Sequence, residues 1–200
     1  MINLLCTFRR DDHPIRLNQE FQRDLTWWCE LFQSWDGLSF FQMSQWAPLP
    51  DFQVSSDASG SLGYGAIFNT HWFCGAWSAS QKPLSIAYKE LFPIVVAAHL
   101  WGPQWTSRRV EFLCDNMSVV AVLSSGTSKE GDLMILLRYL ALLAVRHSFS
   151  FTASSVRGKA NPVADALSRF QFQRFRPLVP LAERSPTPIP RGLLTALQVT

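Results

Sequence analysis

Residues 52–78, FQVSSDASGSLGYGAIFNTHWFCGAWS, contain three short runs with the composition of β-strands. In the second run apolar and aromatic side chains occupy alternate positions, as Tyr64 and Phe68 do, which places them on one face of an extended chain. Only a few residues separate the runs, so hairpins connect them and neighbouring strands are antiparallel. The three predicted strands are Phe52–Ser56, Gly63–Asn69 and His71–Ser78.

Helical and strand patterns alternate after these three runs, as far as about residue 170. Ser85 is a candidate cap for a helix that runs to about Leu100, and Pro93 is expected to kink that helix. The later predicted elements are a strand at Arg109–Cys114, a short helix at Ser118–Leu123, a long helix at Asp132–Arg146, a strand at Ser148–Val156 and a helix at Pro162–Phe170. Three strands followed by alternating helix and strand predict an α/β fold, in which helices flank a mixed five-stranded sheet.

Residues 1–50 carry a different pattern, with apolar residues at spacings of three and four that include Trp28 and Trp35. This spacing predicts an amphipathic helix, capped by Asn18 and ended by Gly37. The aromatic face of such a helix needs a partner. Either the rest of the chain or a neighbouring domain can supply it.

Residues 171–200 hold five of the 12 prolines, most densely in the stretch 185–190. This composition predicts a linker or extended tail that is poorly ordered. The chain is therefore expected to comprise a helical segment at 1–50, an organised domain at 51–170 and a proline-rich linker or tail.

The composition excludes several classes of protein. Hydrophobic residues make up 48% of the 200 and charged residues 16%, which suits a chain with a sizeable core rather than a disordered one. The longest apolar stretch, near Leu133–Val145, is interrupted by Arg138 and is too short to span a bilayer. No amino-terminal stretch has the order of a signal peptide, so we expect an intracellular protein, cytoplasmic or nuclear. The four cysteines lack CxxC spacing and are expected to be free thiols.

Four acidic residues stand where the predicted fold would gather them. Asp57 and Asp115 end two strands, Glu90 lies in the first long helix and Asp165 begins the last helix. Crowded carboxylates raise one another's pKa values unless a divalent cation neutralises them, and oxygen ligands favour Mg²⁺ or Mn²⁺ over Zn²⁺. Two such ions about 3.5–4 Å apart promote phosphodiester cleavage. Each acid taken singly is also explained as a surface or capping residue, and Asp165 especially so.

The residues around these acids form four motifs: Ser56–Asp57–Ala58–Ser59, Lys89–Glu90–Leu91, Cys114–Asp115–Asn116 and, at 156–169, VRGKANPVADALSR. Their acids are separated by 33, 25 and 50 residues. In this order the motifs closely resemble the type 1 ribonuclease H domain of retroelement reverse transcriptases, in the DIRS-type or long-terminal-repeat-like branch. The resemblance covers about residues 52–170.

The resemblance implies a ribonuclease H-like fold and an endonuclease that hydrolyses the RNA strand of RNA–DNA hybrids, leaving a 3′-hydroxyl and a 5′-phosphate. It implies that Asp57, Glu90, Asp115 and Asp165 are catalytic carboxylates that bind two Mg²⁺ ions, for which Mn²⁺ can substitute. Asp57 would bridge both ions. Glu90 and Asp115 would hold the ion near the leaving group, and Asp165 the ion beside the attacking water.

Recognition of a hybrid requires contacts to 2′-hydroxyls across a wide minor groove and to phosphates. Ser59, Gly60 and Asn116 follow the strand ends and are candidates for the first kind of contact. Arg157 and Lys159, in the loop before the last helix, are candidates for the second. Apart from the four acids, the predicted domain holds 10 basic and 4 acidic residues, which favours a polyanionic partner.

The sequence lacks the Tyr-x-Asp-Asp motif of a polymerase palm. We therefore interpret the chain as a piece of a polyprotein with an upstream reverse transcriptase polymerase domain. The loop at 156–161 lacks the histidine that many type 1 enzymes carry, so we expect slower turnover. One alternative is a catalytically inactive remnant or connection module that binds nucleic acid or protein. Another is an integrase, but there the glutamate usually comes last of three acids, whereas Glu90 comes second.

Overall fold

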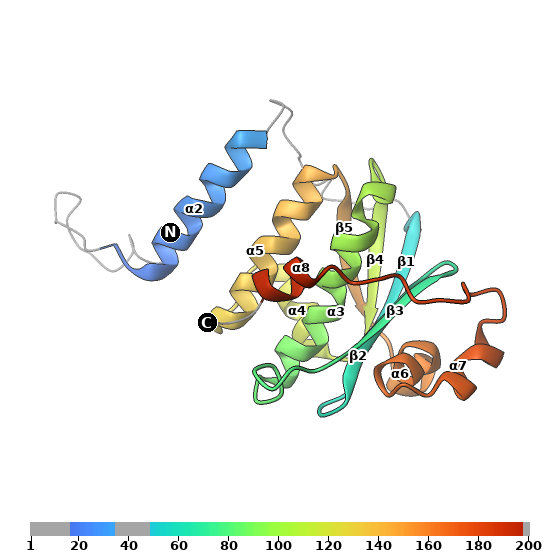
Figure 1. The fold of residues 1–200 in the computed structure, drawn as a ribbon. Coiled ribbons are helices and arrows are strands. Elements are labelled where there is room, and N and C mark those ends of the chain that lie inside the picture. Colours follow the sequence, from blue (N-terminus) through green and yellow to red (C-terminus); the bar gives the residue numbers. More distant parts are fainter. Residues whose placement is uncertain (1–16, 35–48, 198–200) are drawn as a thin grey trace. The chain divides into compact units, whose positions relative to one another are not determined.

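The computed structural model of the protein describes residues 17–34 and 49–197 (Figure 1). Within that part, the side chains of Ser34, Lys159, Thr195 and Ala196 are not described. The chain divides into two units, residues 1–39 and residues 40–200, and each is considered by itself.

A mixed five-stranded sheet organises the second unit (Figure 1). Its strands are β1 (Phe52–Ala58), β2 (Gly63–Phe68), β3 (His71–Ala76), β4 (Arg109–Cys114) and β5 (Ser150–Ser155). They lie in the order β3-β2-β1-β4-β5. β2 is antiparallel to both β1 and β3, whereas β1, β4 and β5 are mutually parallel. This arrangement confirms the predicted fold class, since hairpins join the antiparallel strands and helical crossovers join the parallel ones.

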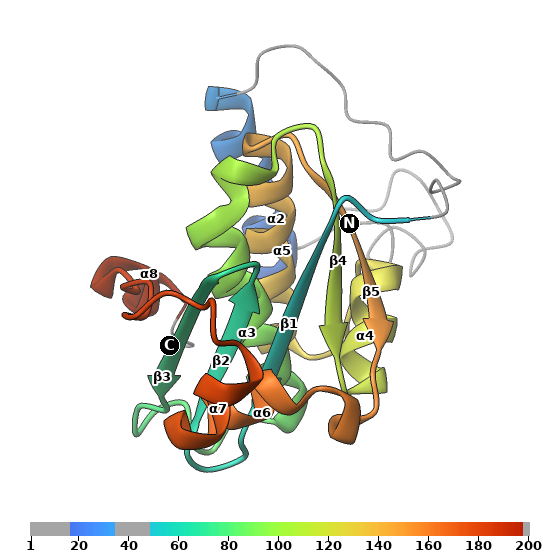
Figure 2. The same cartoon turned by 90° about the vertical axis from the view of Figure 1, so that its right-hand side faces the viewer.

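Helices cover both faces of this sheet. They are α3 (Ile86–Trp101), α4 (Met117–Ser125), α5 (Gly131–Arg146), α6 (Pro162–Ser168), α7 (Phe172–Leu178) and α8 (Arg191–Ala196), with 3-10 turns at Gly102–Trp105 and Gly158–Ala160. α3 lies against β1 and β2, and α5 packs on α3 (Figures 1 and 2). α6 lies against the opposite face of the same two strands and leads into α7. No helix in the described ranges is long and apolar enough to cross a membrane.

The period of two in β2 decides what each face of the sheet contacts. The Tyr64 ring points to the α3 side, where its centroid lies 4.9 Å from that of Phe92. Gly65 points to the α6 side, where a side chain at that position would meet Leu167. The predicted strand and helix bounds agree with the structure within two residues, and α3 continues through Pro93. One difference matters for function, because β1 extends far enough to include Asp57.

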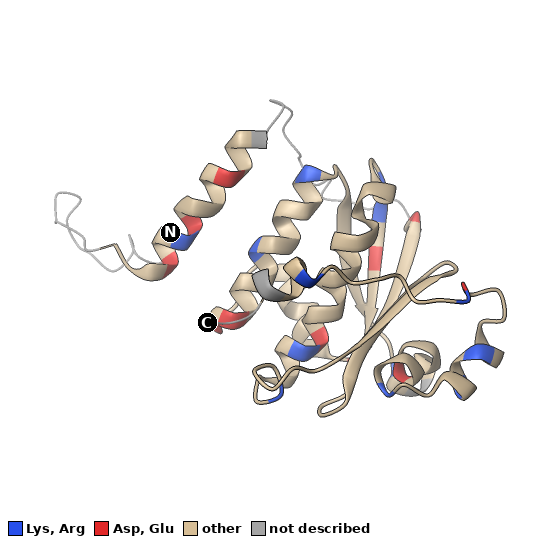
Figure 3. Ribbon diagram, in the orientation of Figure 1, with Lys and Arg blue, Asp and Glu red and all other residues tan. Residues whose placement is uncertain are grey.

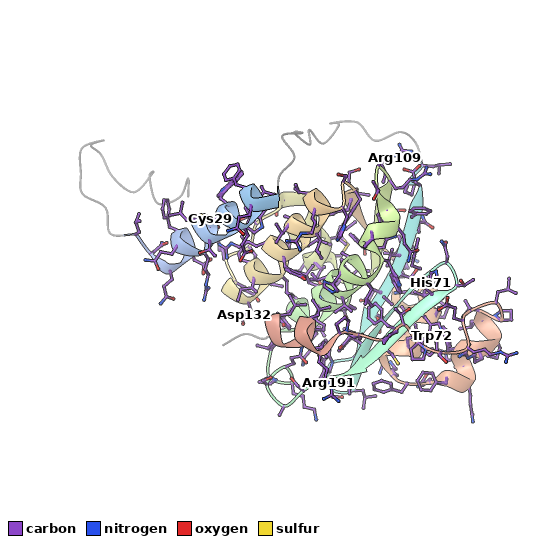
Figure 4. The ribbon with its side chains drawn as sticks, turned by 45° about the horizontal axis from the view of Figure 1, so that its top comes forward. Cys29, His71, Trp72, Arg109, Asp132 and Arg191 are labelled. Atoms are coloured by element: carbon purple, nitrogen blue, oxygen red, sulfur yellow. The ribbon has the colours of Figure 1, made fainter. Side chains whose placement is uncertain are left out.

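The expectation of a poorly ordered tail is wrong for residues 171–197. Phe175 of α7 is fully buried, and its ring centroid lies 4.9 Å from that of Trp72 on β3. Trp72 is labelled in Figure 4. Beyond α7 the extended chain follows the β3 edge, where Glu183 N donates to the Thr70 carbonyl. Proline suits such an edge because a peripheral strand leaves some N–H groups without a ladder partner.

Arg176 fixes the turn that carries the tail from α7 to the β3 edge. Its guanidinium donates to the carbonyl oxygens of Ala182, Glu183 and Arg184 at 2.6–3.3 Å. The same group lies over the Trp72 ring, 5.2 Å from its centroid. One arginine thereby donates to three carbonyls of the turn, and the Glu183 carbonyl also accepts from Trp72 Nε1.

The first unit contains α2 (Gln19–Ser34). Asn18 Oδ1 accepts a hydrogen bond from Phe21 N at 2.8 Å, which confirms the predicted cap. The rings of Trp28 and Phe32, one helical turn apart, are stacked. Trp35 and Gly37, expected in or after this helix, lie outside the described residues, and the partner of its aromatic face stays a prediction.

Three of the four cysteines fall in the described part of the chain. Cys29, Cys74 and Cys114 are free thiols there. Cys6 lies outside it. The described cysteines therefore agree with the expectation of free thiols.

We predict that Gly65→Ala destabilises the protein by about 1–3 kcal/mol, the usual cost of overpacking a core. An added Cβ would lie 2.5 Å from the Leu167 Cβ, so β2 and α6 must separate. Urea unfolding of the variant and the wild type measures the change. Gly60→Ala is the matched control, because no atom lies within 4 Å of a Cβ at Gly60. Equal losses in both variants would contradict the packing of α6 on β2.

Candidate metal centre

The parallel pairing of β1 and β4 brings two of the acids to the same edge of the sheet. Ser55 pairs with Leu113, so positions two residues further along, Asp57 and Asp115, are level with each other. α3 packs across β1 and carries the third acid, Glu90. Asp57 and Glu90 are buried, with 6% and 4% of their surface exposed, whereas Asp115 is exposed. Three elements that are far apart in the sequence therefore deliver carboxylates to one place.

Glu90 and Asp115 are close enough to share a cation. Their carboxylate oxygens and the Cys114 sulfur all lie within 4.8 Å of one another. The Ala58 backbone N–H donates to the Glu90 carboxylate, but Oε2 of that carboxylate has no hydrogen-bond partner. A buried polar atom without a partner is costly, so a ligand at this position would be stabilising.

Burial and like charge act together on the two buried carboxylates. Burial first, and then the charges of Asp57 and Asp115, raise the pKa of Glu90 to about 9. Burial and the charges of Asp115 and Asp165 likewise raise the pKa of Asp57 to about 6. Ser168 opposes that shift, because its hydroxyl donates to Asp57 Oδ2 at 2.5 Å. The negative charges of Asp57, Glu90 and Asp115 are therefore not balanced by nearby positive charge, which raises the two pKa values.

Asp165 is arranged differently from the other three acids. It lies in α6, half-buried, and it acts on the pKa of Asp57. Its Oδ1 accepts from Arg169 Nε at 2.7 Å and its Oδ2 accepts from Arg174 Nη1 at 2.5 Å. Burial alone would raise the pKa of Asp165, but the two guanidinium groups outweigh it and lower the pKa. Arg169 directly follows α6 and Arg174 lies in α7. Figure 3 shows that acidic and basic residues occur together in this part of the ribbon.

The structure thus brings Asp57, Glu90 and Asp115 together and leaves the fourth acid neutralised by arginines. Sequence reasoning missed the groups that organise this arrangement. Ser168 stands within the ADALSR motif, but a serine in a helix has many ordinary roles. Arg174 follows that motif, in a segment whose composition predicted a tail.

The residues predicted to contact a hybrid also lie at this edge. The Ser59 hydroxyl is buried and accepts from Leu62 N, so it holds the turn between β1 and β2. Gly60 is exposed on that turn. Asn116 caps α4, its Oδ1 accepting from two backbone N–H groups. Arg157 is exposed, and the side chain of Lys159 lies outside the described part.

The loop that carries these last two residues lies against the carboxylates. A Cβ built at Gly158 would lie 3.2 Å from Asp115 Oδ2, so the backbone of the loop passes close to that acid. Asn161 Nδ2 donates to the Ser56 carbonyl at 2.9 Å and ties the loop to β1. The loop and the strand end are therefore one rigid wall of the site.

These residues fit a hard divalent cation. Two of the three donors that face one another are carboxylate oxygens, and Oε2 of Glu90 is buried without a partner. Burial raises the pKa of the Cys114 thiol to about 12, so at neutral pH the thiol is protonated and uncharged. A hard cation does not remove that proton. Mg²⁺ or Mn²⁺ would supply the missing positive charge.

Two solved structures resemble the chain in fold. One is the amino-terminal ribonuclease H domain of Rv2228c from Mycobacterium tuberculosis, solved as a fusion with maltose-binding protein. The match has 17% sequence identity and a TM-score of 0.43, and it covers 62% of this chain and 98% of the mycobacterial chain. The other is the foamy viral protease-reverse transcriptase in complex with an RNA/DNA hybrid. The match has 10% sequence identity and a TM-score of 0.44, and it covers 68% of this chain and 23% of the viral chain. No protein-family model and no curated protein matches the sequence. The assignment of a ribonuclease H-like α/β fold rests on the strand order and pairing described above.

We predict that Glu90→Gln and Asp57→Asn each stabilise the metal-free protein above pH 7, by on the order of 2 kcal/mol. Both pKa values are raised on folding, so ionisation costs stability as the pH rises, from about 4 to about 6 for Asp57 and from about 4.5 to about 9 for Glu90. Unfolding in a chelator measured across this range tests the prediction. The advantage of the variants should vanish below pH 4 and shrink when Mg²⁺ is added.

Asp132→Asn is the control for that experiment, since it removes one carboxylate from the start of α5. It should not gain stability with rising pH. A flat difference between wild type and Glu90→Gln over the whole range would contradict the buried charge cluster.

Proposed function

We propose that the region 51–170 is a ribonuclease H that hydrolyses the RNA strand of RNA–DNA hybrids, as part of a retroelement reverse transcriptase. The observation that carries the proposal is the meeting of Asp57, Glu90 and Asp115 at the carboxyl ends of β1 and β4. Open α/β sheets bind ligands at such strand ends. The motifs that surround these acids are those of the resemblance to type 1 ribonucleases H.

Asp57, Glu90 and Asp115 would hold one Mg²⁺ ion, and Asp57 with Asp165 a second. Bound ions of this kind lower the pKa of a water and stabilise charge on a phosphodiester. The chain's own part is to fix the ligands. Ser168 holds the Asp57 carboxylate through its hydroxyl, and the Ala58 N–H holds that of Glu90. Preorganised ligands of this sort need no rearrangement as charge develops.

In the proposed reaction a water oxygen forms a bond to the scissile phosphorus, and the bond from that phosphorus to the 3′-oxygen breaks. The products are a 3′-hydroxyl and a 5′-phosphate. The hybrid would pass over two pairs of residues. The minor groove would face Gly60 and Asn116, and phosphates would face Arg157 and Lys159. Because the Ser59 hydroxyl already holds the turn, Ser59 would act through its backbone.

The second candidate function is a module of the same fold that binds a hybrid or a protein without cutting. One observation favours it: both oxygens of Asp165 are engaged by arginines. In the context of a reverse transcriptase either module would follow a polymerase domain, which would share the grip on the hybrid.

We predict Mg²⁺- or Mn²⁺-dependent cleavage of a labelled RNA–DNA hybrid by the full chain, and its loss by at least about 100-fold in Asp57→Asn, which removes a bridging charge. Denaturing gels with end-labelled RNA measure the cut and its 3′-hydroxyl product. Asp132→Asn loses the same charge away from the site and should keep full activity. Binding of the hybrid without cleavage by the wild type would favour the second candidate instead.

We further predict that Arg174→Gln lowers the Mg²⁺ concentration needed for half-maximal cleavage by about threefold to tenfold. The variant frees Asp165 Oδ2 from its guanidinium partner. Arg184→Gln is the matched control, because it removes the same charge from an exposed position of the tail. If Arg174→Gln abolishes cleavage at every Mg²⁺ concentration, the arginine holds Asp165 in its working position rather than competing with the ion.

A further inference from the structure

The thiol of Cys114 is the one part of the acidic cluster that the proposed hydrolysis does not use. It ends β4, directly before Asp115, and it is completely buried. Its sulfur and one carboxylate oxygen from each of Glu90 and Asp115 lie within 4.8 Å of one another. Among the residues that the structure describes, no other three His, Cys, Asp or Glu side chains approach so closely.

A second observation concerns the Glu90 carboxylate, which points to a ligand at this cluster. Glu90 is 96% buried, and its Oε2 has no hydrogen-bond partner. The sulfur of Cys114 has only weak partners in Asn116, whose N–H lies 3.3 Å away and whose carbonyl oxygen lies 4.0 Å away. A buried carboxylate oxygen thus stands unsatisfied beside a buried sulfur.

We propose that Glu90, Cys114 and Asp115 form a site for a thiophilic divalent cation, Zn²⁺ or Cd²⁺, that overlaps the oxygen site for Mg²⁺. Zinc accepts both cysteine sulfur and carboxylate oxygen, usually in a tetrahedron that a water completes. In such a tetrahedron ligand atoms are about 3.3–3.8 Å apart. The three atoms must therefore approach one another on binding, which requires movement of Glu90 or Cys114 as well as of the exposed Asp115 side chain.

The chemistry of the thiol separates the two kinds of ion. Binding forms a bond from sulfur to the cation, and the thiol proton leaves to solvent. Zn²⁺ and Cd²⁺ have high affinity for sulfur and displace the thiol proton when they bind, whereas Mg²⁺ prefers oxygen ligands. The Asn116 N–H, which already points to the sulfur, would stabilise the thiolate. Mg²⁺ would leave the thiol protonated and use the oxygens alone.

The overlap has a consequence for activity, and this part rests on the proposed function. A thiophilic ion that holds Glu90 and Asp115 excludes Mg²⁺ from the same oxygens. Zn²⁺ would then inhibit cleavage of the hybrid, and a chelator would restore it. The thiol would make the enzyme sensitive to the balance between zinc and magnesium.

The test is a titration of the full, metal-free chain with Cd²⁺, followed by the ultraviolet charge-transfer absorption of a cadmium–thiolate bond. Cys6→Ser and Cys29→Ser are introduced first, to remove one thiol outside the described residues and one on α2. We expect one equivalent of Cd²⁺ to produce the absorption, and excess Mg²⁺ to weaken the apparent affinity. Cys114→Ser should abolish the absorption, and Cys114→Ala should do the same where serine impairs folding.

Two further variants decide between the three-ligand site and a lone thiol. Glu90→Gln should weaken Cd²⁺ binding by at least about tenfold, the loss of one ligand. Cys74→Ser, on β3, should leave the titration unchanged. Absorption that survives in Cys114→Ser or Cys114→Ala, or Cd²⁺ affinity unaltered in Glu90→Gln, overturns the inference.

The outcome is separable from the proposed nuclease activity. A chain that binds Cd²⁺ through Cys114 but never cuts a hybrid contradicts only the proposed function. A chain that cuts the hybrid with Mg²⁺ but shows no absorption dependent on Cys114 contradicts only the thiophilic site.

Discussion

The repulsion among buried carboxylates at the carboxyl ends of β1 and β4 is the constraint around which the site is organised. Glu90 lies on α3, which packs on β1, whereas Asp57 points to the opposite face of β1, where Ser168 of α6 contacts it. Both carboxylates are buried by these helices. Two neutral donors ease the repulsion, the Ser168 hydroxyl and the Ala58 N–H. The fold thereby keeps an unfavourable cluster in place, and strain of this kind is characteristic of sites that await a ligand.

The position of α6, the helix that supplies Ser168, depends on the lack of a side chain at Gly65 in the strand beneath it. Leu167 of α6 lies against β2 where Gly65 stands, and this close approach sets the height of α6 above the strand end. Asn161 ties the preceding loop to β1. A glycine, an amide and a hydroxyl, none of them acidic, therefore determine where Asp165 lies relative to Asp57.

The individual strands and the acids at their ends can be predicted from the sequence because both leave local patterns. Apolar residues alternate in β2, and an acid directly follows β4. Other features leave no such pattern. The pairing of Asp165 with Arg174 depends on how α7 turns back, and a helix of seven residues among prolines has too little periodicity to be recognised. Phe175 likewise looks like an isolated aromatic residue in the sequence, and only the fold shows that its ring packs on Trp72 of β3.

Charge is distributed unevenly within the site, and this unevenness distinguishes its two halves. On the side of Glu90 and Asp115, negative charge lies beside a buried thiol and an unpartnered oxygen, and the charge of Arg169 reaches Asp115 only as a longer-range interaction. On the side of Asp165, two guanidinium groups already provide the positive charge that an ion would bring. A cation arriving at the first half gains the full electrostatic benefit, whereas one at the second must first displace an arginine. Binding of two ions would therefore be sequential, with Glu90 and Asp115 filled first and Asp165 engaged only when a polyanion draws the arginines away.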